Sequence, residues 1–262
     1  MDFYELLNIS EKYMDSSTPS NPEKLITAGE ILGLKEGERI IDLGCGYAQT
    51  LILWAEHFGI NGVGIEIREE ACKRARNRIE EKGLNDKIEI ANMDAREFIS
   101  GYGHYDVAVG MGVSYVWNGY RHTIRALRKA IHKSGRLFVG EPIWLTDQLP
   151  KDYTDKGPFY TSFELLKIAR SEGFDYEYMS QSNFDELDRF ESDNWRGILN
   201  WIRNNPGHCE RNNIIKHFHK IQDEYLRYGR QYMGWLLHIL APVSYSEDLP
   251  EKSLKLLSPS SK

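Results

Sequence analysis

The sequence has few features of an extracellular or membrane protein. Its 262 residues include only three cysteines, Cys45, Cys72 and Cys209, an odd number without paired spacing. Such sparse cysteines fit a reducing compartment better than a disulfide-stabilised fold. No run approaches the roughly 20 apolar residues that a membrane helix needs. The first ten residues also lack the basic and apolar regions of a secretion signal. We therefore expect a cytoplasmic protein that does not enter a membrane.

The chain also lacks an excess of positive charge. Lysine and arginine number 33 against 39 aspartates and glutamates, which gives a net charge of −6 and a pI near 5.8. This balance disfavours general attraction to nucleic acid or to anionic membranes, although a local basic patch stays possible. Arg74, Arg76 and Arg78 could suggest nucleic-acid binding, but glutamates flank them on both sides, at 69–70 and 80–81, which indicates a solvated helix face.

No usual metal-binding spacing is present. Cys209, His217 and His219 follow a Cys-x7-His-x-His pattern, and the two histidines would face different sides of a helix. We expect no metal site.

The most informative stretch is residues 39–50, RIIDLGCGYAQT. An apolar run ends at Asp42, and three small residues follow at alternate positions, Gly44, Gly46 and Ala48. A helix-like run comes next. This pattern predicts a buried strand, a tight turn and a helix start. Glycines allow the backbone to approach a ligand closely, and the helix N-terminus presents free N–H groups.

The spacing of this turn discriminates between ligands. A dinucleotide site follows G-x-G-x-x-G, and a P-loop needs G-x-x-x-x-G-K-[ST]. Here the pattern is D-x-G-x-G-x-A, and no lysine follows. The Asp42 carboxylate would repel a phosphate but suits a cationic ligand. The turn therefore favours a ligand less anionic than a pyrophosphate.

This stretch resembles motif I of the class I S-adenosylmethionine (SAM) dependent methyltransferases, with Ala48 replacing the third glycine. The whole chain looks similar to the broad group that includes the small-molecule, ubiquinone-biosynthesis-like (type 11) enzymes. The resemblance implies an α/β fold, a Rossmann-like seven-stranded sheet with helices on both faces. An ordinary strand–helix turn is the alternative for the motif alone.

The resemblance also implies a SAM site. Glu66 ends the strand at 62–67, about 20 residues after the glycine turn, where the family's matching acid binds the ribose diol. Asp94 matches the acid that bonds the adenine amino group, and it also suits a helix N-cap, which is compatible with that role. The implied cofactor-binding residues are Asp42, Gly44, Gly46, Glu66, Ile67, Asp94, Ala95 and Gly110.

The sequence signals for the part of the site that would bind the methyl acceptor are less specific. The strand at 105–112 ends in Gly-Met-Gly-Val, whereas the family's enzymes that act on base amino groups carry an Asn/Asp-Pro-Pro-aromatic motif there. After an expected helix at 121–133, a strand at 136–144 leaves Glu141 at its carboxyl end. A desolvated carboxylate there could orient or deprotonate an acceptor, or simply cap the following loop. Tyr115 is the candidate to orient the acceptor.

We divide the chain into an N-terminal helical cap (1–34), a SAM-binding α/β core (35–183), a helical insertion (184–230), the last core strand (231–245) and a C-terminal tail (246–262). Within the core, Ser162 is the expected N-cap of a helix. The insertion is rich in aromatic residues. A small helical core explains most of them, and the alternative is a lid over the substrate.

The sequence therefore predicts a SAM-dependent methyltransferase acting on a small-molecule acceptor. The alternatives are a SAM-binding protein without turnover and a nucleic-acid methyltransferase.

Overall fold

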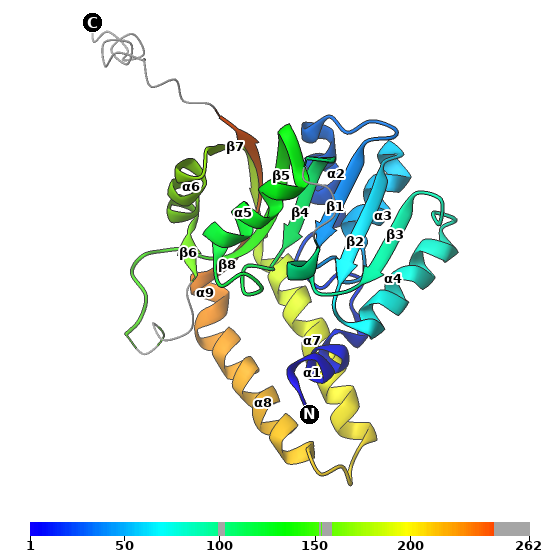
Figure 1. Ribbon diagram of the computed structural model, residues 1–262. Helices are drawn as coiled ribbons and strands as arrows, with labels where there is room; N and C mark the ends of the chain where they lie inside the picture. Colours follow the sequence, from blue (N-terminus) through cyan, green and yellow to red (C-terminus); the bar gives the residue numbers. More distant parts are fainter. Residues whose placement is uncertain (99–102, 152, 154–158, 244–262) are drawn as a thin grey trace, which may run out of the picture.

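A computed structural model describes residues 1–98, 103–151, 153 and 159–243. A central twisted sheet carries helices on both faces, and a pair of long helices extends from one edge of the strands (Figure 1). The predicted C-terminal tail, 246–262, lies outside the described residues.

The sheet confirms the predicted fold class. Its strand order is β3-β2-β1-β4-β5-β8-β7, and one further strand, β6, pairs with β5. The first five strands are parallel, whereas β8 runs antiparallel to both β5 and β7. The strands are β1 (Arg39–Leu43), β2 (Asn61–Glu66), β3 (Ile88–Asn92), β4 (Tyr105–Met111), β5 (Ile131–Trp144), β6 (Tyr160–Thr161), β7 (Phe174–Gln181) and β8 (Met233–Pro242). The two-residue β6 makes the sheet eight-stranded rather than seven-stranded.

Both faces of the sheet are buried. Adjacent residues of a strand point to opposite faces. Ile40 therefore packs in the core under one set of helices, and Ile41 packs under the other. The first face carries α2 (Pro22–Leu32), α3 (Gln49–Phe58) and α4 (Glu69–Glu81), and the second carries α5 (Tyr120–Ala130) and α6 (Ser162–Ser171). This explains why the strands are continuous apolar runs rather than alternating ones.

Three local expectations need correction. The helix expected at 121–133 is α5, which ends at Ala130, and β5 begins at Ile131 rather than at 136. The cause is a bulge, because the β4–β5 register jumps from Tyr105 opposite Ile131 to Val107 opposite Arg136. The N-cap of α6 is Thr161 rather than Ser162. Thr161 and Glu164 form a reciprocal capping box, which fixes the helix start at Ser162, one residue earlier than expected.

The insertion before the last strand is confirmed. Between β7 and β8 lie α7 (Phe184–Asn204), α8 (Arg211–Glu224), the short π-helix η3 (Tyr225–Gly229) and α9 (Arg230–Tyr232). α7 and α8 form a hairpin with its own apolar core, made of Ile198, Ile202, Ile214 and Phe218. Among the described residues, no helix combines the length and the apolarity needed to cross a membrane.

The N-terminal segment rests on this hairpin. Its helix α1 (Phe3–Ser10) and the 3-10 turn η1 (Glu11–Tyr13) pack against α7 (Figure 1). The contact requires Gly197, because a Cβ there would lie 2.3 Å from the carbonyl oxygen of Ser10 and 2.5 Å from that of Ile9. The glycine therefore lets the backbone of α1 approach the helix closely.

We predict that Gly197→Ala destabilises the protein although alanine is the better helix former. Overpacking costs about 1–3 kcal/mol, whereas exchanging a helical glycine for alanine gains at most about 1 kcal/mol. Urea unfolding measures the net change. Gly207→Ala is the control, because nothing lies within 4 Å of a Cβ there. If Gly197→Ala is as stable as the parent, α1 does not depend on this close contact.

Candidate functional site

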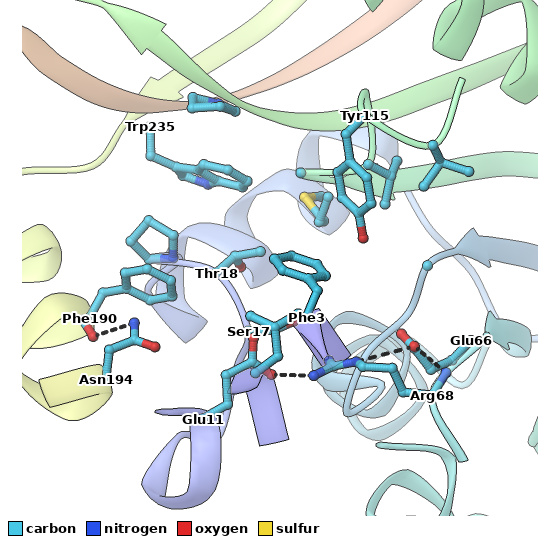
Figure 2. A pocket seen from close by; sticks show the side chains of 18 of the residues that line it. Phe3, Glu11, Ser17, Thr18, Glu66, Arg68, Tyr115, Phe190, Asn194 and Trp235 are labelled. Atoms are coloured by element: carbon cyan, nitrogen blue, oxygen red, sulfur yellow. Dashed lines mark hydrogen bonds and ion pairs between the residues drawn. The ribbon is translucent and has the colours of Figure 1, made fainter. Parts of the chain in front are cut away.

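A cavity of about 630 Å³ lies at the carboxyl ends of the parallel strands. In open α/β sheets this edge is where ligands bind, at the point where the strand order reverses between β1 and β4. Three parts of the chain line it: the N-terminal segment, the strand ends and the insertion. Figure 2 shows Trp235, Phe190 and Asn194 on one side of this cavity and Glu66 with Arg68 on the other.

The glycine turn after β1 is held against the end of β2. The backbone N–H groups of Gly44 and Cys45 both donate to the Ile65 carbonyl, at 2.8 and 2.9 Å. The Gly46 N–H donates to Oε2 of Glu66 at 3.0 Å. Gly44, Gly46 and Ala48 all have positive φ, so Ala48 adopts a conformation that costs a non-glycine residue some strain. Gly44 lines the cavity, whereas Gly46 lies behind it and contacts Glu66.

Glu66 belongs to a buried network of charges. Its Oε1 accepts from the Arg68 backbone N–H at 2.8 Å and from Nε at 3.4 Å. Arg68 also donates to Glu11 at 2.8 Å, and the Tyr47 hydroxyl donates to the same Glu11 oxygen at 2.9 Å. Burial, reinforced by the charge of Glu11, raises the pKa of Tyr47 to about 12. The two carboxylates raise the pKa of Arg68, which overcomes its desolvation.

Asp42 lies beneath the turn rather than in the cavity lining. Its side chain is 2% exposed, and its Oδ1 has no hydrogen-bond partner among the described residues. Burial, and secondarily the charge of Glu66, raises the pKa of Asp42 to about 7. A buried acceptor without a partner is costly, which makes this atom a feature that a ligand or a water molecule would satisfy.

Ile67, Asp94 and Ala95 line the cavity beside Glu66. Asp94 is the N-cap of the 3-10 turn η2 (Ala95–Glu97), which confirms that part of the prediction. The Arg96 side chain also bonds both carboxylate oxygens, at 3.1 and 3.0 Å, and this lowers the pKa of Asp94. The carboxylate is therefore charged and fixed at the cavity edge.

The two acceptor-side candidates lie in different surroundings. Tyr115 lines the cavity and is 63% exposed. Glu141 is 5% exposed and lies outside the lining, whereas its neighbour Pro142 belongs to it, because successive residues of β5 face opposite sides. Oε1 of Glu141 accepts a short hydrogen bond from the Ser114 hydroxyl. Burial raises the pKa of Glu141 to about 7, and the Ser114 hydrogen bond opposes this rise.

Gly110 also lies behind the cavity. A Cβ at Gly110 would lie 3.1 Å from Val113 and 3.2 Å from Leu127, so this glycine serves packing inside the sheet. Gly112, which has a φ of +67°, lines the cavity instead. Of the ten predicted site residues, six form part of the lining: Gly44, Glu66, Ile67, Asp94, Ala95 and Tyr115.

One further wall of the cavity comes from Phe190, Glu191 and Asn194 of α7, from Tyr225 of η3 and from Trp235 of β8. The sequence offered the insertion as a lid over the substrate only as an alternative, and it named none of these residues as a site residue. The Trp235 indole N–H donates to the Ser20 hydroxyl at 3.0 Å, which fixes the ring. The position of Trp235 at the start of the last strand is the signal that could have identified it. Other insertion aromatics, Trp195, Trp201 and Phe218, pack within the helical hairpin, as the sequence favoured.

Comparison with known proteins agrees with this geometry. The model of the mycolic acid cyclopropane synthetase family matches residues 17–152, just over half of the chain. The uncharacterized protein YjhP of Escherichia coli K12 is 27% identical over 241 residues, covering 90% of this chain and 97% of YjhP.

Two crystal structures of SAM-dependent methyltransferases are also similar, each in complex with S-adenosyl-L-homocysteine (SAH). The enzyme from Geobacter sulfurreducens is 29% identical, with a TM-score of 0.86 over 92% of this chain and 99% of its own. The enzyme from Thiobacillus denitrificans is 28% identical, with a TM-score of 0.84 over 92% of this chain and 100% of its own. The chain belongs to the mycolic acid cyclopropane synthetase family, within the class I SAM-dependent methyltransferases.

Proposed function

We propose that this protein transfers the methyl group of SAM to a small-molecule acceptor bound between the strand ends and the helical insertion. One observation carries the proposal. A single cavity joins the cofactor edge of the sheet, at Gly44 and Glu66, to an aromatic wall supplied by α7, η3 and β8. Its volume lies in the range of small-molecule sites. We further propose that 184–230 is the substrate lid.

The residues of the cofactor edge fit SAM. We assign the Glu66 carboxylate to the ribose diol and the Asp94 carboxylate to the adenine amino group, with Ile67 and Ala95 beside the ring. Both arginines that line the cavity are already paired, Arg68 with Glu11 and Glu66, and Arg96 with Asp94. The edge therefore offers no free cation to a phosphate, which disfavours a pyrophosphate ligand.

The residues behind the cavity support those that line it. Gly46 orients the Glu66 carboxylate through its N–H. Asp42 lies beneath the turn with an oxygen available to a donor. Gly110 allows the close packing that positions the exit of β4.

Methyl transfer depends mainly on how the protein positions the acceptor relative to SAM. SAM supplies an electrophilic methyl group, so the protein must hold the acceptor in line with it and exclude water. We propose that Tyr115 orients the acceptor from the β4 side, whereas α7 and η3 cover it from the other side.

The free thiol of the exposed Cys209 suits a reducing cytoplasm.

The proposal is tested by a transfer screen. Protein and methyl-labelled SAM are incubated with fractionated small-molecule extracts, and label in a product is measured. We expect transfer to a small molecule together with calorimetric binding of SAM and SAH. Binding of both ligands without any labelled product would instead favour a SAM-binding protein without turnover.

Glu66→Gln is predicted to weaken SAM and SAH binding. A hydrogen bond to a charged group contributes about 1.5–3 kcal/mol, so we expect roughly a 10- to 150-fold rise in Kd for both ligands by calorimetry. Glu69→Gln is the matched control, because Glu69 is exposed three residues later. Unchanged SAM affinity in a Glu66→Gln protein with the parent melting temperature would remove Glu66 from the site.

Glu141 is predicted to act through Ser114. We propose that it fixes the loop carrying Tyr115, since its carboxylate bonds Ser114 and does not line the cavity. Glu141→Leu and Ser114→Ala each remove this hydrogen bond, so they should reduce methyl transfer by the same factor, up to about tenfold. Glu141→Gln should stay near the parent rate, because its amide oxygen can still accept from Ser114. SAM affinity should stay at the parent value in all three variants. A loss of about a hundredfold or more in Glu141→Gln alone, with Ser114→Ala active, would show that Glu141 is a general base.

A further inference from the structure

The acceptor half of the cavity contains one carboxylate without a cationic partner. Glu191 lies on α7 and lines the cavity beside Phe190 and Asn194. Within residues 1–98, 103–151 and 159–243, no lysine or arginine is paired with it. Arg230, a cation that contacts the same helix, is bonded to Asp188 at 3.0 and 3.1 Å. The Tyr225 hydroxyl also donates to Asp188, at 2.7 Å.

The surroundings of Glu191 leave its charge uncompensated. Burial, and secondarily the charge of Glu224 on α8, raises the pKa of Glu191 to about 7. A desolvated carboxylate is costly unless a cation approaches it. A positively charged ligand would therefore bind more favourably beside Glu191, and its binding would return the carboxyl group to its charged form.

Aromatic rings surround the same space. Phe190, Tyr225 and Trp235 all line this half of the cavity, and Figure 2 shows the rings of Phe190 and Trp235 on the same side of it. The faces of such rings attract cations, most strongly when the cation is an ammonium group shielded from water. The Asn194 amide N–H donates to the Phe190 carbonyl at 3.1 Å, so its carbonyl oxygen is left as an acceptor.

We propose that the acceptor half binds an ammonium group, so that the methyl acceptor is a small amine or quaternary-ammonium compound anchored by Glu191 and the rings of Phe190, Tyr225 and Trp235. The inference rests on the proposed function and names its substrate class. The ammonium nitrogen has no lone pair, so it anchors the acceptor, and the methyl group is transferred to a different, nucleophilic atom of the same molecule. The sulfur–methyl bond of SAM breaks as the bond to that atom forms, which leaves SAH. The cofactor end competes poorly for such a ligand, because its carboxylates at Glu11, Glu66 and Asp94 are already paired with arginines.

A pair of probes with the same shape tests the anchor. Choline carries a quaternary ammonium group, and 3,3-dimethylbutan-1-ol replaces its nitrogen with carbon. Binding of each to the SAH-loaded protein is measured by calorimetry and by ligand-detected NMR. We expect choline to bind at least about tenfold more tightly than the neutral alcohol, as an ion pair joined to a cation–π contact predicts.

Matched variants assign the effect to one side chain. Glu191→Gln should abolish the preference for choline, whereas Asp185→Asn, which changes the net charge equally from an exposed position on the same helix, should keep it. Equal binding of the two probes, no choline binding, or the parent preference in Glu191→Gln would each overturn the proposal. The ratio of SAM to SAH affinity should not change in Glu191→Gln. A changed ratio would assign the carboxylate to the sulfonium and likewise overturn it.

The transfer screen separates this proposal from the proposed function. Fractions that accept label are passed over a cation-exchange resin, and the acceptor should be retained. Label confined to unretained fractions would overturn the ammonium acceptor while leaving methyl transfer established. A choline preference that depends on Glu191, in a protein that labels no fraction, would uphold the ammonium site and count against methyl transfer.

Discussion

The ion pairs of Arg68 with Glu11 and Glu66 are the interaction on which the site depends. One guanidinium joins the N-terminal segment to the end of β2, and through Glu66 it reaches the glycine turn at Gly46. All three charged side chains are at least nine-tenths buried. Removing one partner from such a group leaves an uncompensated charge in a dry environment, which is far more costly than the loss of a surface pair. The geometry of the turn and the position of the N-terminal segment are therefore coupled.

The topology of the sheet decides where the insertion lies. The parallel strands end at the cavity edge, and β8 runs antiparallel to β5. It follows that β8 begins at this edge. Since β7 is antiparallel to β8, it ends at the same edge. Any segment inserted between β7 and β8 must leave and re-enter the sheet beside the cavity. The placement of Phe190, Glu191 and Tyr225 in the wall follows from strand order before any side chain is considered.

The sequence predicted the features that depend on local pattern. Apolar runs predicted the strands, and glycine spacing predicted the turn after β1. It did not predict contacts between distant segments, nor which side of the sheet a given side chain faces. No pattern links Glu11 to Arg68 across 57 positions. The side chain of Glu141 was placed at the correct strand end, but whether it or Pro142 faces the cavity depends on the pleat at that register. The start of β5 was also predicted wrongly, because the bulge depends on how β4 and β5 pair and not on the local sequence of β5.

The N-terminal segment, which lines the cofactor end of the cavity, and α7, which lines the acceptor end, are mechanically coupled. α1 packs on α7 without an intervening side chain at Gly197. Further contacts strengthen the connection: Arg196 of α7 lies over the Tyr13 ring at 4.4 Å, and Lys24 of α2 pairs with Glu186 at 2.6 Å. Packed interfaces of this kind transmit displacement rather than absorbing it. A movement that opens the N-terminal segment must therefore also move the helix that carries Phe190 and Glu191. Access for the cofactor and the shape of the acceptor half are consequently not independent.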